Sequence, residues 1–321
     1  MQPTTAPYIS SAVTFSLAFW LFLGSLSTAA EAKNGFDLSN ASIPTAEILQ
    51  GGPPRDGIPV ISDPAMISAE EAEYLEDDDR VLGIVIDGIA KAYPIRILNW
   101  HEIVNDAIND KNYAITYCPL CGTGVVFDAN IEGVNSEFGV SGLLYNSDVL
   151  LYDRNTGSLW SQILSKSVSG KRVGKVLKRL PVNHTSWKVW KARHPKTLAM
   201  SLKTGFHRDY GRNPYSGYET SKSIYFAVKN RAPENYHPKE EVLGIEVSGI
   251  FKAYPFIELE RGKKTNFNDT MGQVKLKLNW DSDARQLQVY KNSGEEVIGV
   301  QGFWFAWFAF HPNTLVFTGN Q

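Results

Sequence analysis

The sequence predicts a mainly β fold with a few short helices, a β-rich α+β class, built as two tandem copies of one unit, the first with an insertion. Short runs rich in β-branched and aromatic residues alternate with turn signals along most of the chain. Residues 81–98 (VLGIVIDGIAKAYPIRIL) and 242–259 (VLGIEVSGIFKAYPFIEL) are identical at eleven of eighteen positions without a gap. The pattern W-x-x-W-x-x-x-H-P-x-T-L then follows in both halves, at 187–198 and 304–315. Matching blocks in the same order indicate an internal duplication.

The division of the chain follows from these blocks. NWHEIVND and YCPLCGTG of the first copy correspond to ERGKKTNFND and LNWDSDARQ of the second, where the counterparts of His101, Glu102 and both cysteines are missing. This asymmetry favours an active first copy and a degenerate, structural second copy. The predicted parts are a signal peptide (1–32), a lead segment (33–80), the first copy (81–205) with its insertion (129–181), a connecting segment (206–241) and the second copy (242–321).

Individual elements are predicted from local patterns. A β-hairpin is expected around Asp87-Gly88, a strong turn signal. Helices are expected at 69–76, 97–107, 187–193 and 304–310, the last two ended by His-Pro. We expect both copies in one body, because each alone offers few strands for a core. Further strands are predicted beside the cysteine pair (112–117 and 124–128) and within the insertion (138–142, 149–154 and 158–163).

Composition and charge limit the classes of function. The chain has 321 residues, of which 43% are hydrophobic and 21% charged, an ordinary globular composition. A formal net charge of −2 offers no basic excess to neutralise phosphates, so nucleic acid is not an expected partner. The expected partner is an unidentified small molecule or protein.

The N-terminal segment has the features of a secretory signal peptide. Residues 11–24 form an apolar run, and Ala30-Glu31-Ala32 fits the small-x-small rule for cleavage after Ala32. That run, like the aromatic run at 302–310, is shorter than the roughly 20 residues of a membrane-spanning helix. We therefore expect a periplasmic or secreted mature chain without a transmembrane span; an uncleaved N-terminal anchor is the alternative.

Four long motifs resemble a known family. KAYPIRILNWHEIVND, ITYCPLCGTGVVFD, FGVSGLLYNSDVLLYDRNTGSLWSQ and FWFAWFAFHPNT occur in this order. Together they resemble the domain-of-unknown-function family numbered 3179, over about residues 50 to 320. The resemblance implies a bacterial or archaeal protein, often made with a signal peptide, for which the family supplies no assigned activity.

The two cysteines of the chain, Cys118 and Cys121, form a CxxC motif between two predicted strands. Two thiolates at a tight turn can bind one metal ion, and the first copy offers His101 as a third ligand. Soft thiolates with one imidazole suit copper or zinc. His207 is a further possible ligand, and Glu102 is a possible ligand or general base. Asp106, with Asn105, is expected to orient His101 or to line the site.

Two other interpretations of the same residues stay open. In the first, Cys118 and Cys121 cycle between dithiol and disulfide as a thiol-disulfide oxidoreductase, with Glu102 as a catalytic neighbour. In the second, the cysteines only brace a turn, and the two copies frame a binding module. Arg154, Trp160 and Gln162 of the insertion then line a ligand pocket, unless Arg154 merely pairs with Asp153 in a turn.

Overall fold

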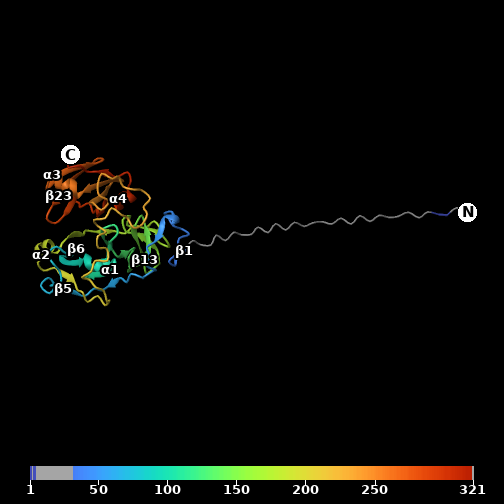
Figure 1. Cartoon of the computed structure of the whole chain (residues 1–321), viewed down its shortest axis with the longest axis horizontal. Coiled ribbons are helices and arrows are strands. Elements are labelled where there is room, and N and C mark those ends of the chain that lie inside the picture. The colour runs from blue at the N-terminus through green and yellow to red at the C-terminus, as the bar shows by residue number, and fades with distance from the viewer. Residues whose placement is uncertain (2, 5–31, 320–321) are drawn as a thin grey trace. The chain divides into compact units, whose positions relative to one another are not determined.

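Strands are the main regular structure of the chain, and several are buried on both faces and do not alternate between buried and exposed side chains. The computed structural model describes residues 1, 3–4 and 32–319, which hold twenty-six strands and four short α-helices (Figure 1). The mainly β class predicted from the sequence is confirmed. The predicted signal peptide lies almost entirely outside the described residues.

The residues from Ala32 onward belong to one compact unit. Figure 1 shows α3, α4 and β23 of the C-terminal part gathered at one end of it, and α1, α2, β5 and β6 at the other. Among the described residues, no helix combines the length and apolar character needed to cross a lipid bilayer.

A nine-stranded sheet runs through the unit and joins its two ends. Its main path is β26-β21-β20-β25-β10-β9-β8-β4, and β17 pairs with β10 beside this path. The link between the ends is the pairing of Gly124 in β10 with Gln301 in β25. The strands are β4 (Ile61–Ser62), β8 (Ile103–Ile108), β9 (Lys111–Cys118), β10 (Thr123–Asp128), β17 (Arg179–Leu180), β20 (Glu241–Val247), β21 (Ile250–Pro255), β25 (Val300–Phe303) and β26 (Leu315–Val316).

Two five-stranded sheets and one three-stranded sheet pack around it. The order β16-β15-β14-β13-β3 makes a sheet largely from the predicted insertion: β16 (Lys166–Ser169), β15 (Leu159–Ser161), β14 (Asp148–Asp153), β13 (Phe138–Tyr145) and β3 (Ile48–Gln50). The second has the order β18 (Asn183–Ser186), β6 (Arg80–Ile86), β7 (Ile89–Pro94), β19 (Leu198–Met200) and β5 (Met66–Ser68). The third consists of β22 (Asn266–Met271), β23 (Val274–Asp281) and β24 (Gln286–Lys291).

The remaining elements are short. Two-stranded ribbons are formed by β1 (Ala32–Lys33) with β2 (Phe36–Asp37) and by β11 (Asn130–Ile131) with β12 (Val134–Asn135). A 3₁₀ turn covers Thr45–Glu47. The four helices, each of seven residues, are α1 (Ile95–His101), α2 (Trp187–Arg193), α3 (Phe256–Gly262) and α4 (Trp304–Phe310).

Several sequence predictions of elements are confirmed. The hairpin β6–β7 turns at Asp87 and Gly88, which both have positive φ (51° and 77°). Helices α2 and α4 match the predicted ranges, and each ends at the histidine before proline.

Two predicted helices are wrong. Residues 69–76 form turns: Ser68 and Glu71 cap one another's amides as at a helix start, but the single helical bond from Ala72 to Ser68 is followed by a three-residue turn from Leu75 to Ala72. The helix predicted over 97–107 ends at His101, because Glu102 has a φ of 58° that a right-handed helix cannot continue. Residues 103–108 instead pair with β9 as a strand.

The order of elements is the same in two segments of the chain. Both segments, 80–200 and 241–316, begin with a hairpin and a helix, continue with three strands, and end with a strand, a helix and a last strand. The first segment also contains the strands of the insertion. The two segments differ in sheet membership: β8, β9 and β10 belong to the nine-stranded sheet, whereas β22, β23 and β24 form a sheet of their own.

Candidate metal centre

The cysteine turn joins two antiparallel strands of the nine-stranded sheet. Cys118 ends β9 and pairs with Thr123 at the start of β10. The amide of Cys121 donates to the carbonyl of Cys118 at 3.2 Å, and Gly122 closes the turn with a φ of 62°. A positive φ at this position favours glycine. The predicted placement of the CxxC motif between two strands is confirmed.

Strand β25, from the C-terminal part of the chain, packs against this turn. The amide of Phe303 in β25 donates to the Cys121 carbonyl at 2.8 Å. A Cβ on Gly302 would lie 2.4 Å from Thr123 Cγ2, so only glycine fits there without displacing the turn. Segments far apart in sequence therefore fix the positions of both sulfur atoms.

A second turn, from the insertion, meets the cysteines. Strands β13 and β14 are joined through Asn146 and Ser147, which have φ values of 51° and 68°, as a two-residue hairpin turn requires. The Ser147 carbonyl accepts from the Cys121 thiol at 3.3 Å and from the Cys118 thiol at 3.8 Å. The next residue, Asp148, is thereby brought beside both sulfurs.

Cys118, Cys121 and Asp148 form a compact group of potential metal ligands. One ligand atom from each lies within 4.8 Å of the other two. The three residues are 2%, 0% and 1% exposed, and both thiols are free. In the part of the chain that the structure describes, this is the one group of three or more His, Cys, Asp or Glu residues with such spacing.

Burial shifts the ionisation of Asp148, Cys121 and the neighbouring Glu102 toward their neutral forms. It raises the pKa of Asp148 to about 7, although amide hydrogen bonds, including one from Ile163 at 3.1 Å, act in the opposite direction. It raises the pKa of Cys121 well above its ordinary value, with Cys118 adding to the effect. Burial, with the charge of Asp148, raises the pKa of Glu102 to about 8. Negative charge is costly here unless a cation compensates it.

A chain of side-chain hydrogen bonds joins Thr123, Gln162 and Thr116 beside the cysteine turn. Thr123 donates to Gln162 at 2.6 Å, and Gln162 donates to Thr116 at 2.8 Å. All three are fully buried, and the Thr123 hydroxyl also lies 3.5 Å from an Asp148 carboxylate oxygen. Gln162, predicted to line a pocket beside the cysteines, bonds to Thr123, the first residue of β10 after the cysteine turn.

Two buried hydroxyls near the cysteines have no hydrogen-bond partner. They are Ser147 Oγ and the Tyr218 hydroxyl, on residues that are 0% and 1% exposed. Tyr218 packs in the same core cluster as both cysteines. Its pKa is raised by burial and next by the nearby thiols, while the Tyr225 backbone acts in the opposite direction. A buried hydroxyl without a partner costs about 1–3 kcal/mol, so a water or ion bound beside these two would be stabilising.

His101, the predicted third ligand, is not in this group. The last residue of α1, it is fully buried, with Nδ1 2.7 Å from the Pro59 carbonyl and Nε2 2.7 Å from the Tyr210 hydroxyl. Both ring nitrogens therefore have partners away from the sulfurs. Asp148 takes the place that the sequence interpretation gave to His101.

The other predicted site residues are spread over separate contacts. His207 is exposed and lies outside the group. Asp106 accepts from Lys91 at 2.8 Å and from Tyr93 at 2.6 Å, within a polar contact of its own. Arg154 pairs with Asp56 at 3.0 Å and not with Asp153, the alternative that the sequence left open beside a pocket role.

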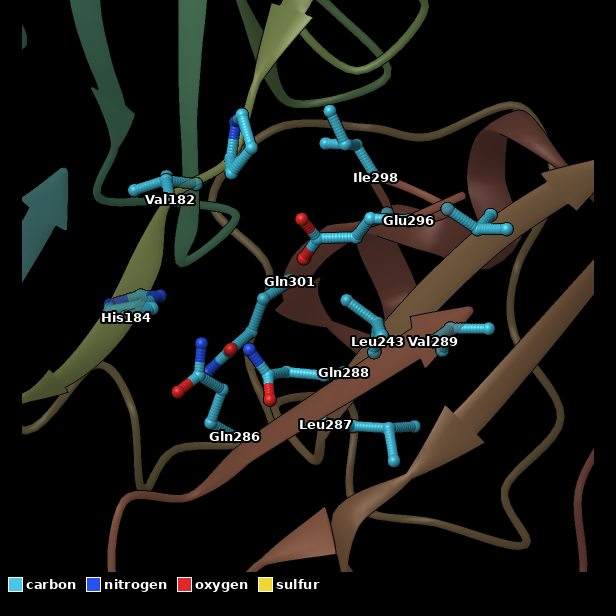
Figure 2. A pocket seen from close by; sticks show the side chains of 14 residues that line it. Val182, His184, Leu243, Gln286, Leu287, Gln288, Val289, Glu296, Ile298 and Gln301 are labelled. Atoms are coloured by element: carbon cyan, nitrogen blue, oxygen red, sulfur yellow. The ribbon is translucent and has the colours of Figure 1, made fainter. Parts of the chain in front are cut away.

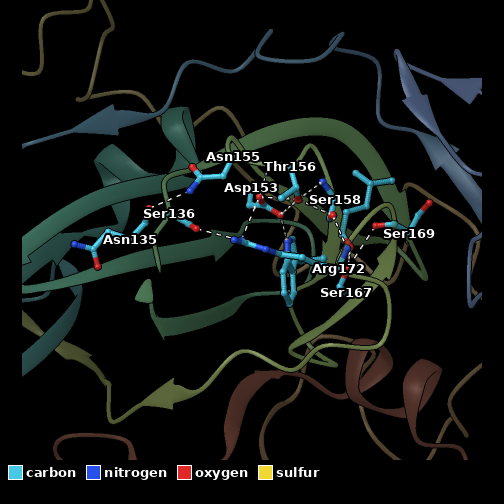
Figure 3. Close-up of polar contacts among 11 residues, drawn as sticks. Asn135, Ser136, Asp153, Asn155, Thr156, Ser158, Ser167, Ser169 and Arg172 are labelled. Atoms are coloured by element: carbon cyan, nitrogen blue, oxygen red, sulfur yellow. Dashed lines mark hydrogen bonds and ion pairs between the residues drawn. The ribbon is translucent and has the colours of Figure 1, made fainter. Parts of the chain in front are cut away.

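Asp153 instead organises a buried polar network in the insertion. It accepts from Trp160 Nε1 at 2.9 Å and pairs with Arg172 at 3.3 Å (Figure 3). Thr156 donates to the same carboxylate. Trp160, predicted as a pocket residue, is fully buried here, and this network braces the sheet that carries Asp148.

Sequence reasoning missed Asp148 and Tyr218. Asn146-Ser147-Asp148 carries a turn signal, and the carboxylate directly after this turn was the one sequence feature that could have pointed to Asp148 as a site residue. Tyr218 belongs to the connecting segment, and no local sequence pattern links that segment to the cysteines.

Comparison with known proteins places the chain in a family. No curated protein and no solved structure matches it. The profile of the family described as "Protein of unknown function (DUF3179)" matches residues 55–296, about three quarters of the chain, including the cysteine turn and Asp148. The chain belongs to this family of proteins of unknown function, as its motifs suggested.

Proposed function

We propose that this protein binds one zinc ion through Cys118, Cys121 and Asp148. The observation that carries the proposal is the approach of two sulfurs and one carboxylate oxygen within 4.8 Å in a fully buried site. A divalent cation would compensate the charge of the ionised ligands, which burial otherwise disfavours.

The ligand types favour zinc over copper. The sequence interpretation left both metals open because thiolates and an imidazole suit either. A carboxylate in place of the imidazole is a harder ligand, which suits Zn²⁺ better than Cu⁺. Three protein ligands would leave one coordination position, next to the unpartnered Ser147 and Tyr218 hydroxyls. When bound, the ion would supply Lewis acidity at that position.

Thiol-disulfide exchange has less support. An attacking cysteine needs an accessible thiolate. Cys118 and Cys121 are almost completely buried, and the pKa of Cys121 is raised rather than lowered. A purely bracing role leaves the buried Asp148 carboxylate beside the thiols unexplained.

Elemental analysis tests the proposal directly. Protein purified without chelators is expected to contain one equivalent of zinc, and Cys118→Ser is expected to reduce this at least tenfold. Asp148→Asn is expected to reduce it likewise, whereas Asp128→Asn, at a half-buried carboxylate outside the ligand group, is the control and should leave the zinc content unchanged. Metal-free wild-type protein that does not take up added zinc would refute the proposal.

We also propose that the two segments with the same element order are copies of one ancestral unit. Lys91 and Tyr93 hold Asp106 at 2.8 and 2.6 Å. Lys252 and Tyr254 hold Asp269 in the same way, at 2.5 and 2.7 Å. Trp190 donates to Thr197 at 2.8 Å and Trp307 to Thr314 at 3.0 Å. The cysteines belong to the first copy alone, which supports an active and a structural half.

We further propose that the protein is exported and that its signal peptide is cleaved after Ala32. The apolar run at 11–24 and the small-x-small motif ending at Ala32 support cleavage by signal peptidase. N-terminal sequencing of the mature protein from its native source tests this. We expect the mature chain to begin at Lys33; an intact N-terminus on a membrane-bound protein would instead support the anchor.

A further inference from the structure

Positive charge is concentrated in one stretch of the chain. Residues 154–208 contain thirteen Lys and Arg residues and no Asp or Glu, although the whole chain has a formal net charge of −2. The densest part is 166–178 (KSVSGKRVGKVLK), which runs from β16 to the residue before β17. We call these residues the basic turn. A local excess of one charge on a nearly neutral protein favours a partner of the opposite charge.

Backbone hydrogen bonds give the basic turn a defined shape. The Gly174 amide donates to the Ser167 carbonyl at 2.9 Å, and the Ser167 amide donates to the Lys175 carbonyl at 2.9 Å. Lys166 and Val176 face one another across an isolated antiparallel bridge. The segment therefore doubles back on itself, and residues directly opposite in such a pair present their side chains on the same face.

Four lysines of the basic turn face solvent, whereas one arginine points inward. Leu177 is 3% exposed, so its neighbours Val176 and Lys178 project to the opposite, outer side. Arg172 pairs with the buried Asp153 at 3.3 Å (Figure 3). The exposed lysines are Lys166, Lys171, Lys175 and Lys178.

The exposed lysines have charge to offer a partner. Lys175 and Lys178 each lie near one carboxylate, at 2.5 and 4.0 Å. Exposed ion pairs of this kind are weak and can exchange for another anion. Lys166 and Lys171 make no ion pair with any residue that the structure describes. Both ammonium groups are therefore available to an external anion.

Exposed aliphatic side chains lie among these lysines. Val176 is 69% exposed, more than any other large apolar side chain described from residue 32 onward, and Val173 is 36% exposed. Val134, 49% exposed, belongs to the neighbouring hairpin, whose Glu132 pairs with Lys175. One exposed valine needs no explanation, but three of them beside four lysines form an amphipathic surface.

The amphipathic surface ends where the chain turns inward. Pro181, Val182 and His184 line a cavity of about 40 Å³ against the second segment. Figure 2 shows Val182 and His184 on one side of this cavity, facing Gln286 and Gln301. These side chains after β17 face protein, so the exposed charge belongs to the basic turn itself.

A bilayer with anionic lipids matches this surface better than a protein or a nucleic acid does. Lysine is depleted from the cores of protein–protein interfaces. Single-stranded nucleic acids stack their bases on aromatic side chains, and the basic turn has none. At a membrane surface, by contrast, phosphate groups are available to the lysines and acyl carbons to the valines.

We propose that the basic turn docks on the surface of a bilayer that contains anionic lipids. The ammonium groups of the lysines contact lipid phosphates, while their aliphatic stems and the three valines enter the headgroup layer. None of these residues belongs to the group of Cys118, Cys121 and Asp148, so docking does not depend on the proposed zinc. The contact holds the protein at a membrane surface without a spanning helix.

Co-sedimentation with lipid vesicles tests the proposal. The chain from residue 32 onward is used, because it holds the whole compact unit and lacks the apolar run at 11–24. Vesicles of equal parts phosphatidylcholine and phosphatidylglycerol are compared with phosphatidylcholine alone. We expect at least tenfold tighter binding to the anionic vesicles at about 0.1 M salt. At about 1 M salt most of this difference should disappear, because screening shortens the range of the attraction.

Two double variants with the same loss of charge locate the contact. Lys166→Gln/Lys171→Gln is expected to weaken binding to anionic vesicles at least tenfold, since each lysine near such a surface contributes about fivefold. Lys191→Gln/Lys196→Gln, at two exposed lysines elsewhere in the stretch without acids, is the control and should bind like the wild type. All four side chains are exposed, so neither variant disturbs the core.

Val176→Ser separates a membrane from a soluble polyanion, for which heparin is the probe. We expect this variant to bind anionic vesicles about threefold more weakly, because it removes apolar contact with lipid, and to bind heparin like the wild type. The proposal is overturned if anionic vesicles bind no better than neutral ones, or if the first double variant binds like the wild type. Unchanged vesicle binding of Val176→Ser would also overturn it, in favour of a site for soluble polyanions.

Discussion

At the scale of single residues, the identity of the third ligand decides the chemistry of the cysteine site. Asp148 lies with both sulfurs, while His101 has both ring nitrogens bonded elsewhere. We predict that Asp148→Asn lowers the affinity for Co²⁺, used as a spectroscopic probe for zinc, at least tenfold. His101→Gln keeps the thiolate-to-cobalt charge-transfer absorption, and the opposite pattern would reinstate the imidazole as ligand.

Ser147 combines two unfavourable features in one residue. Its φ is 68°, a region that costs a residue with a side chain about 1–2 kcal/mol, and its hydroxyl is buried without a partner. We predict that Ser147→Gly stabilises the metal-free protein by about 1 kcal/mol in chemical denaturation, after the entropy cost of glycine. Ser248→Gly, at an exposed turn with a φ of 53°, is the control and should give a smaller gain. A loss of stability in Ser147→Gly would contradict this account of the turn.

The limits of sequence reasoning are visible at the same residues. The spacing of Cys118 and Cys121 is local, so their turn between two strands was predictable. Asp148 lies thirty residues after Cys118, and no local pattern reports that two hairpin turns meet. His101 is close to the cysteines in sequence, but the backbone reverses at Glu102 and leaves the imidazole against Pro59 and Tyr210.

At the scale of elements, the same polar contact fastens both hairpins to the strand that follows them. Asp106 and Asp269 each accept from a lysine and a tyrosine of the preceding hairpin. Breaking a buried ion pair costs about 3–5 kcal/mol. We predict that Asp106→Asn and Asp269→Asn each lower the free energy of unfolding by about 3 kcal/mol, measured by urea titration. Strongly unequal losses would argue against equivalent roles in two copies of one unit.

Elements were predicted best where a short pattern decides them. The α2 and α4 helices begin at tryptophan and end before His-Pro, and both signals are local. The sheet that carries Asp148 was predicted only as separate strands, because pairing between β13, β14 and β3 depends on contacts distant in sequence.

At the scale of the whole molecule, buried histidines link stability to pH. Burial, with the charge of Arg179, lowers the pKa of His311 from 6.5 to about 4, so its protonation favours the unfolded chain. The stabilisation that this histidine provides is complete above pH 6.5 and is lost as the pH falls toward 4. Asp148 and Glu102, with raised pKa values, act in the opposite sense and lose stability as the pH rises.

We therefore predict the contribution of His311 as a difference between variant and wild type. His311→Phe keeps the stacking on Phe251, where the ring centroids are 4.0 Å apart, but removes the titrating group. The free energy of unfolding of His311→Phe, relative to that of the wild type, should increase as the pH is lowered from 6.5 to 4 in denaturation experiments. A flat difference for His311→Phe would refute the linkage.

The central claim is that two sulfurs and a carboxylate, brought together by two hairpin turns, bind zinc. X-ray absorption spectroscopy at the zinc edge tests it most directly. The account predicts two sulfur neighbours at about 2.3 Å, oxygen neighbours at about 2.0 Å and no outer-shell scattering from an imidazole ring. Bound zinc without sulfur neighbours, or with clear imidazole scattering, would contradict it.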